Sequence, residues 1–242
     1  MNALRSVVLS LLAVQAGGSA HAASEHMVFL APTNTAMPMG QFTDGKLSGG
    51  ILLDLGKAIA DQLGRKARFV SMPSKRVGMA LRNNEADALC YVLPQWIDGQ
   101  FHWSRPLLPN AAILVALPDA PPIRSLQDLA GTKIGTVSGY RYPELDALLG
   151  KDFLRDDAPT TEHGFSKLAA GRTRYAIVGR AMLAYRQRTD KHFRIRVDHV
   201  FATITAQCAL AAGSRVLPAQ FDKAINTLIE TGAVEHILSS YR

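Results

Sequence analysis

The sequence predicts an α/β protein that contains two successive doubly wound units, each a sheet with flanking helices. Two observations support this fold class. Short apolar segments alternate with longer amphipathic segments, which is the order typical of strands joined by helices. Three prolines in residues 118–122 interrupt this alternation once, after which it begins again. We therefore expect two units rather than one.

The first unit is expected to follow the order strand, helix, strand, helix, strand. The helix at 50–63 has an apolar residue at every fourth position from Ile51 to Leu63, and Gly64 follows as a stop signal. Residues 86–93 are almost continuously apolar, as expected of a strand buried on both faces. The other elements of this unit are strands at 27–32 and 67–72 and a helix at 75–83.

The second unit follows a strand predicted at 111–117 and the proline-rich segment. It is expected to contain a short helical turn at 123–131, strands at 133–137, 153–157 and 175–178, and helices at 143–149, 164–170 and 180–187. Strands at 193–200 and 203–212 and helices at 221–231 and 234–241 complete the chain. This order suggests a chain that builds one unit, crosses to the second and then returns.

The first 22 residues have the parts of a secretory signal peptide. Arg5 gives a positive start, residues 7–16 are mostly apolar, and Ala20-His21-Ala22 is a cleavage motif. The apolar part is too short to span a bilayer, and the small residues before the motif favour cleavage over a retained anchor. We therefore expect a periplasmic protein whose mature chain starts near Ala23.

The mature chain is basic, because removing these residues leaves 26 basic and 20 acidic residues, a net charge of +6. In a cytosolic protein this excess would suggest nucleic acid, but export argues against that partner. A basic exported protein more often meets an anionic ligand, a membrane surface or a membrane partner. Dispersed solubilising charge is the simplest explanation of the excess.

The two cysteines, Cys90 and Cys208, lie in apolar, strand-like segments of a chain expected in an oxidising compartment. A disulfide and two buried thiols both fit this pattern, since distance along the chain does not fix distance in space.

No catalytic or cofactor motif is complete. In residues 135–139 the serine stands one place too late for a nucleophile elbow. The seven histidines show no paired metal-ligand spacing, and no phosphate-binding loop is present. We therefore expect a protein that is not an enzyme and that has no metal or other cofactor.

Four segments, taken together and in this order, resemble the type II periplasmic solute-binding proteins, in the branch of the polar amino acid receptors of ABC transporters (bacterial extracellular solute-binding protein family 3). They are GKLSGGILLDLGKAIADQLG (45–64), PSKRVGMALRNNEADALC (73–90), SLQDLAGTKIGTVSGYRYPELD (125–146) and FSKLAAGRTRYAIVGRAMLAY (165–185).

The resemblance implies a monomeric, two-lobe protein that holds a small molecule in a cleft between the lobes and passes it to an inner-membrane permease. Lobe I would comprise residues 24–112 and 203–242, and lobe II residues 113–202. In this fold the strand that returns from lobe II lies antiparallel to the third strand of lobe I, so Cys208 and Cys90 would be close enough to pair.

Two parts of the amino acid clamp typical of this family are missing. The Thr-x-x-Arg motif, whose arginine grips an α-carboxylate, has no match in PQWIDGQFHWSRP (94–106). The aspartate that holds the α-ammonium is replaced in GRTRYAIVGR (171–180) by Gly179 or Arg180. A standard α-amino acid therefore does not follow from the resemblance.

Candidate ligand-binding residues follow from the rule that ligands bind beyond the carboxyl ends of the strands. Gly139 would let the backbone approach a ligand, and Tyr140 offers a ring face, although a plain turn before a helix starting at Pro143 would also explain this segment. Arg76 and Arg141 would hold a carboxylate or another anion. The full set is Asn34, Arg76, Gln95, Trp96, Ser138, Gly139, Tyr140, Arg141 and Arg180, with Thr35, Met37, Ser74 and Pro94 at the same strand ends.

The sequence thus predicts capture of a small, carboxylate-bearing or anionic ligand for an ABC-type importer. Two alternatives stay open. One is a periplasmic enzyme on the same fold, similar to cyclohexadienyl dehydratases, with Asp44 or Asp98 as its acid. The other is a non-transport partner protein of a periplasmic dehydrogenase.

Overall fold

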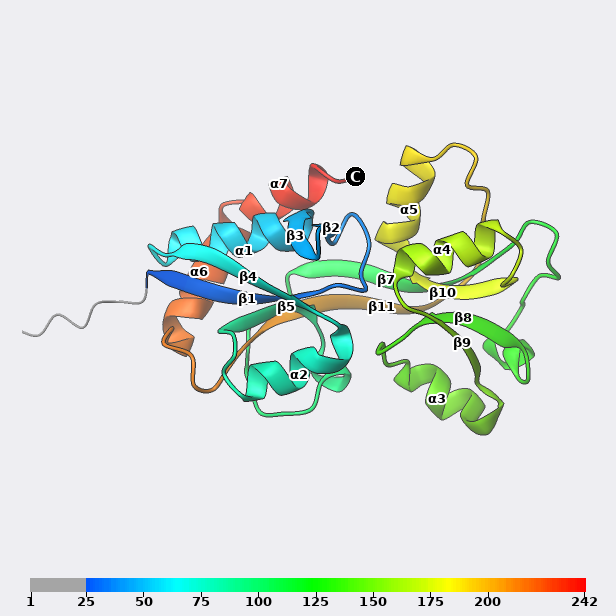
Figure 1. Cartoon of the computed structure of the whole chain (residues 1–242), viewed down its shortest axis with the longest axis horizontal. Helices are drawn as coiled ribbons and strands as arrows, with labels where there is room; N and C mark the ends of the chain where they lie inside the picture. Colours follow the sequence, from blue (N-terminus) through cyan, green and yellow to red (C-terminus); the bar gives the residue numbers. More distant parts are fainter. Residues whose placement is uncertain (1–24) are drawn as a thin grey trace, which may run out of the picture.

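One mixed sheet of nine strands connects the two parts of the molecule (Figure 1). The structure is a computed structural model that describes residues 25–242. The expected signal peptide lies outside the described residues. The strand order is β4-β1-β5-β11-β7-β10-β8-β9, and β6 pairs with β11 beside this path.

Lobe I is built on three parallel strands. β1 (His26–Pro32) lies between β4 (Lys66–Met72) and β5 (Ala88–Val92). The helices of lobe I are α1 (Ile51–Gln62), α2 (Ser74–Arg82), α6 (Pro218–Glu230) and α7 (Ala233–Ser239). Figure 1 shows α1 and α7 on one side of these strands and α2 on the other. The four-residue spacing noted above places Ile51, Leu55 and Ile59 of α1 in the core.

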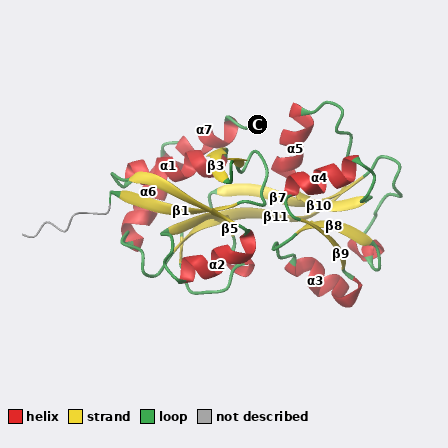
Figure 2. Cartoon of the chain, in the orientation of Figure 1, coloured by secondary structure: helices red, strands yellow, loops and turns green. Residues whose placement is uncertain are grey.

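Lobe II repeats this plan with a second parallel set of strands. β8 (Lys133–Val137) lies between β9 (Leu154–Ala158) and β10 (Tyr175–Gly179). The helices of lobe II are α3 (Pro143–Leu149), α4 (Thr161–Ala169) and α5 (Arg180–Thr189), with α3 on the opposite side of the strands from α4 and α5 (Figure 2).

Two long antiparallel strands run from one lobe to the other. They are β7 (Leu108–Ala116) and β11 (Arg196–Leu210). The lobe boundaries predicted from the sequence, after residues 112 and 202, both fall inside these strands. The division itself stays a prediction, and the names lobe I and lobe II are used here with those boundaries.

The prediction of separate strands at 193–200 and 203–212 was wrong. The pairing of β11 with β7 continues from Arg196 to Ala206, and two shifts in register absorb the irregular sequence between them. Three short strands were not predicted: β2 (Gln41–Thr43) and β3 (Lys46–Gly49), which form a hairpin, and β6 (His102–Trp103). Strands of two to four residues are too short to show a periodicity.

The alternatives for the two cysteines are resolved, because Cys90 and Cys208 form a disulfide. The antiparallel register of β5 and β11 places them opposite each other. The bond ties the strand that returns from lobe II to the sheet of lobe I. No helix within residues 25–242 combines the length and apolar character needed to cross a membrane.

Candidate functional site

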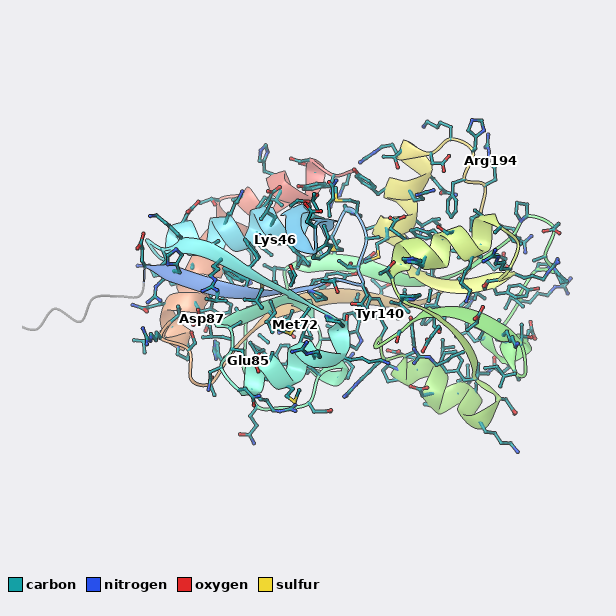
Figure 3. All side chains as sticks on the ribbon, in the orientation of Figure 1. Lys46, Met72, Glu85, Asp87, Tyr140 and Arg194 are labelled. Carbon is teal, nitrogen blue, oxygen red and sulfur yellow. A yellow bond between two sulfur atoms is a disulfide. The ribbon has the colours of Figure 1, made fainter. Side chains whose placement is uncertain are left out.

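A cavity lies between the two lobes and takes its walls from both of them. The walls come from the end of β5 and the turn η1 (Pro94–Trp96), from β7, from the segment between β8 and α3, from the start of α5 and from β11. The carboxyl-end rule for α/β sheets explains why the ends of β5, β8 and β10 meet here. Figure 3 labels Tyr140, which lies where the lobes meet.

The lining of the cavity is mostly apolar and rich in aromatic rings. The rings belong to Tyr91, Trp96, Tyr140, Tyr142 and Phe201. Among the residues of 25–242 that line the cavity, only Arg141 and Glu144 carry a charge.

Four of the nine candidate residues line the cavity: Trp96, Gly139, Tyr140 and Arg141. The other five, Asn34, Arg76, Gln95, Ser138 and Arg180, are not among the residues that form its walls. Arg76, Gln95 and Arg180 are exposed, whereas Asn34 and Ser138 take part in a contact between the lobes. The ligand-binding roles of all nine stay predictions.

Asn34 is the centre of this contact. Its side-chain Nδ2 donates to the Ser138 carbonyl of lobe II at 2.7 Å. Its Oδ1 accepts from Ser74 in its own lobe, from N–H at 3.2 Å and from the hydroxyl at 2.5 Å. Asn34 is only 4% exposed. We call Asn34 and its partners Ser74, Ser138, Tyr140 and Thr161 the Asn34 joint.

The backbone carbonyl of Asn34 completes this joint by accepting from lobe II. Thr161 donates to it from N–H at 3.0 Å and from its hydroxyl at 3.2 Å, and the Tyr140 hydroxyl donates at 3.4 Å. Thr161 begins α4, where helix N–H groups lack partners within the helix. Lobe I therefore satisfies part of a helix end in lobe II, and the joint holds the lobes together.

Gly139 explains how closely the lobes approach. Its φ is +87°, and a Cβ at this position would lie 2.7 Å from Cγ and 3.1 Å from the backbone nitrogen of Lys75 in lobe I. A side chain would thus both strain the backbone and push the lobes apart. Gly139, in the segment between β8 and α3, therefore allows the close contact between the lobes.

Arg141 lies at the edge of the same contact. Its guanidinium donates to both carboxylate oxygens of Asp98 in lobe I, at 2.9 and 2.5 Å. Arg141 and Asp98 remain exposed, with 46% and 74% of their side chains accessible. The hydrogen bond from Arg141 holds the pKa of Asp98 below its ordinary value. Asp98 is therefore engaged in an ion pair rather than placed as a free acid.

Tyr91 was not predicted as a site residue, although it stands near the carboxyl end of β5. Its φ is +60°, which is uncommon for a non-glycine residue and costs about 1–3 kcal/mol. Its hydroxyl accepts from Asn110 Nδ2 at 2.5 Å, and Asn110 Oδ1 accepts from the N–H of Ala181 at the start of α5, at 3.1 Å. Burial raises the pKa of the Tyr91 hydroxyl. This chain of contacts links β5 of lobe I to a helix of lobe II.

Thr35 contributes an unpaired polar group. It lines the cavity, is 7% exposed, and its Oγ1 is buried without a hydrogen-bond partner. Burial raises the pKa of the Tyr140 hydroxyl, and the nearby hydroxyls of Thr35 and Thr161 oppose this rise. The hydrogen bond from the Tyr140 hydroxyl goes to the Asn34 carbonyl. A buried hydroxyl without a partner costs about 1–3 kcal/mol.

Neither of the acids considered from the sequence, Asp44 and Asp98, lines the cavity. Asp44 is exposed in the turn between β2 and β3 and does not line the cavity. Glu144, at the start of α3, does line it. Within residues 25–242 no group of three or more histidine, cysteine or carboxylate side chains is arranged to hold a metal ion.

Two α/β lobes with an apolar cavity between them, joined by two long antiparallel strands, form the fold of the type II periplasmic binding proteins. The sequence profile of the bacterial extracellular solute-binding proteins, family 3, matches residues 29–242, and the chain belongs to this family. No curated protein matches the sequence.

Solved structures share this fold at low sequence identity. An ancestral arginine-binding protein bound to arginine superposes with a TM-score of 0.77 and 22% identity over 90% of this chain and 99% of that chain. ArtJ, the arginine-, lysine-, histidine-binding protein from Geobacillus stearothermophilus, gives 0.74 and 18% over 89% and 94%. The ancestral amino acid-binding protein AncCDT-1, a precursor of cyclohexadienyl dehydratase, gives 0.75 and 16% over 90% and 95%.

Proposed function

We propose that this protein is an exported solute-binding protein that captures a small molecule between its lobes and delivers it to an ABC-type importer in the inner membrane. The observation that carries the proposal is that the cavity takes its walls from both lobes, which also contact each other through the Asn34 joint. A ligand bound there would be released when the lobes separate, as delivery to a permease requires. Membership of the solute-binding family supports the same function.

A thermal-shift screen of amino acids, organic acids, amines and oligopeptides tests this function. A ligand at 100 times its Kd adds about 2.7 kcal/mol of stability, which raises the Tm of a chain of this size by about 5–10 °C. Ala112 lines the cavity, so the Ala112→Phe variant places a ring in the space where the ligand would bind. Ala184→Phe places the same ring at an exposed position of α5. The shift should disappear in the first variant and persist in the second. A hit that survives Ala112→Phe, or no hit in the whole screen, would reject the proposal.

We further propose that the ligand carries a carboxylate or another anionic group, held by Arg141. Among the described residues that line the cavity, Arg141 is the cation, and it already binds the Asp98 carboxylate in a bidentate pair. A ligand carboxylate would compete with Asp98. Arg141→Gln should therefore weaken binding of the hit from the screen, and Asp98→Asn should strengthen it.

A basic ligand is the competing candidate. The ancestral arginine-binding protein and ArtJ are described as binding basic amino acids. Among the described residues that line the cavity, Glu144 is the carboxylate. With a basic ligand, Glu144→Gln should weaken binding while Arg141→Gln should not. The two variants together decide the sign of the ligand's charge.

We propose binding without catalysis. Asp98 is occupied by Arg141, and Asp44 lies in an exposed turn away from the cavity wall. Incubation with prephenate or arogenate, followed by product analysis, tests the dehydratase alternative, and any turnover abolished by Glu144→Gln would establish it. Co-purification with a periplasmic dehydrogenase would instead support the partner-protein alternative.

A further inference from the structure

We infer that the enclosed part of the ligand is a planar ring that carries a hydrogen-bonding substituent. This inference rests on the proposed function, because it names the class of molecule that the same cavity would take. Three observations carry it: the partial burial of the aromatic side chains, the unpaired hydroxyl of Thr35, and the exposure of the charged groups.

The aromatic side chains of the cavity leave apolar surface uncovered. Tyr91, Trp96, Tyr140 and Phe201 all line it and all remain only half-buried, although they lie between packed lobes. The rings of Tyr91 and Trp96 meet edge to face, with centroids 6.3 Å apart and an interplanar angle of 66°. A flat apolar ligand placed against such rings covers this surface and adds ring-to-ring contacts that an aliphatic chain does not make.

The hydrogen-bonding substituent is inferred from Thr35 and Tyr140, which belong to different lobes. Thr35 of lobe I has a buried Oγ1 without a hydrogen-bond partner. The Tyr140 hydroxyl of lobe II lies near it and donates to the Asn34 carbonyl over a long distance of 3.4 Å. A ligand hydroxyl or amide that lies between the Thr35 and Tyr140 hydroxyls when the lobes close around the ligand would form a hydrogen bond with each of them. Buried polar groups are otherwise almost always hydrogen-bonded, so this orphan oxygen marks a place for a ligand atom.

The charged groups explain why the ring, rather than a charge, is enclosed. Arg141 is paired with Asp98 where the two lobes meet, and both side chains are largely exposed. Among the described residues that line the cavity, Glu144 is the other charged one, and it too is exposed. A charge buried among the rings would lack a buried partner, whereas a charge near the exposed groups keeps both water and a counterion.

Calorimetry with matched pairs of probes tests the inference on the mature chain. The ring probes are benzoate, 4-hydroxybenzoate, L-phenylalanine and L-tyrosine. The saturated counterparts are cyclohexanecarboxylate and L-cyclohexylalanine, which keep the carboxylate and the approximate size but lose the planar ring. L-arginine is added as the basic probe. We expect at least one ring probe to bind about tenfold or more tightly than its saturated counterpart, and the hydroxylated member of its pair to bind more tightly than the parent.

Variants assign the effect to the proposed groups. Trp96→Leu should reduce the preference for the ring over its saturated counterpart, while Trp103→Leu, at a tryptophan that does not line the cavity, should leave it unchanged. Thr35→Val should remove the preference for the hydroxylated probe without reducing the affinity of the parent. In a Trp103→Phe background, Trp96 is the remaining tryptophan, and its fluorescence should change on binding.

Several results would overturn the inference. They are equal affinity for ring and saturated probes, binding of L-arginine in place of the ring probes, binding that ignores Trp96→Leu, or no binding by any probe. If the broader screen then finds a non-ring ligand whose binding Ala112→Phe blocks, the ring inference fails while the proposed function stands. If no ligand of any class binds in the cavity, both fail.

Discussion

The Cys90–Cys208 bond and the Asn34 joint connect neighbouring parts of the chain by different chemistry. The disulfide joins two strands of one sheet within lobe I, and Cys208 is fully buried. The Asn34 joint connects the two lobes through hydrogen bonds. A covalent bond lies where the proposed function needs no movement, and reversible bonds lie where the lobes have to separate. The comparison predicts that the disulfide mainly determines the free energy of unfolding, and that the Asn34 joint mainly determines how far the lobes are closed.

The largest effect is expected from removal of the disulfide. The bond closes a loop with a sequence separation of 118 residues, and the chain-entropy relation gives about 4–5 kcal/mol for a loop of this length. Reduced protein and the Cys90→Ala/Cys208→Ala double variant should both lose about this much free energy of unfolding in urea. Their lobe closure, followed by small-angle scattering, should be unchanged. Equal stability of the oxidised and reduced forms would contradict the prediction.

Asn34→Ala should have the next largest effect, and unlike removal of the disulfide it should also change lobe closure. It removes the side-chain bonds to Ser138 and Ser74 and leaves their polar groups unpaired, which costs about 2–3 kcal/mol in total. Part of this loss should appear as a shift toward separated lobes, seen as a larger radius of gyration without ligand. Asn83→Ala, at an exposed asparagine, is the matched control. If the variant and the control scatter alike, Asn34 does not hold the lobes together.

The fold could be predicted largely because its signals are local. The four-residue spacing from Ile51 to Leu63 fixes a buried stripe on α1 wherever the helix lies, and the apolar run at 86–93 requires burial on both faces. The break predicted within β11 was wrong because a shift in register leaves the same local pattern as a loop. That error also hid Phe201, which lies at the predicted break and lines the cavity.

The candidate site could be predicted only in part. The carboxyl-end rule located Trp96, Gly139, Tyr140 and Arg141 at the cavity. The same rule chose Arg76 and Arg180, both of which are exposed. The rule gives a position along the chain but not the direction of a side chain. Tyr91 was missed because its left-handed backbone depends on contacts with distant residues such as Asn110.

Thr35→Val should have a smaller effect, and it should be stabilising. The substitution keeps the shape of the side chain and removes the buried hydroxyl that lacks a partner. We expect the free protein to gain about 1 kcal/mol, measured as a higher Tm without ligand. Thr161→Val is the contrasting variant, because its hydroxyl donates to the Asn34 carbonyl at 3.2 Å, and it should destabilise. Destabilisation by both variants would mean that the Thr35 hydroxyl has a partner after all.

The smallest effect is expected at the exposed Arg141–Asp98 pair, whose charges are solvated and screened by salt. The pKa of Asp98 is lowered in the folded protein, first of all by the hydrogen bond from Arg141. A lowered carboxyl pKa means that the pair's stabilising effect is fully present above the ordinary value of 3.8 and is lost as the pH falls through the lowered value. The Tm difference between the protein and its Asp98→Asn variant should therefore be constant from neutral pH down to this range and shrink below it. It should also shrink at neutral pH in about 1 M salt, where the Debye length is about 3 Å. A difference that persists in acid and in salt would show that Asp98 acts through packing rather than through its charge.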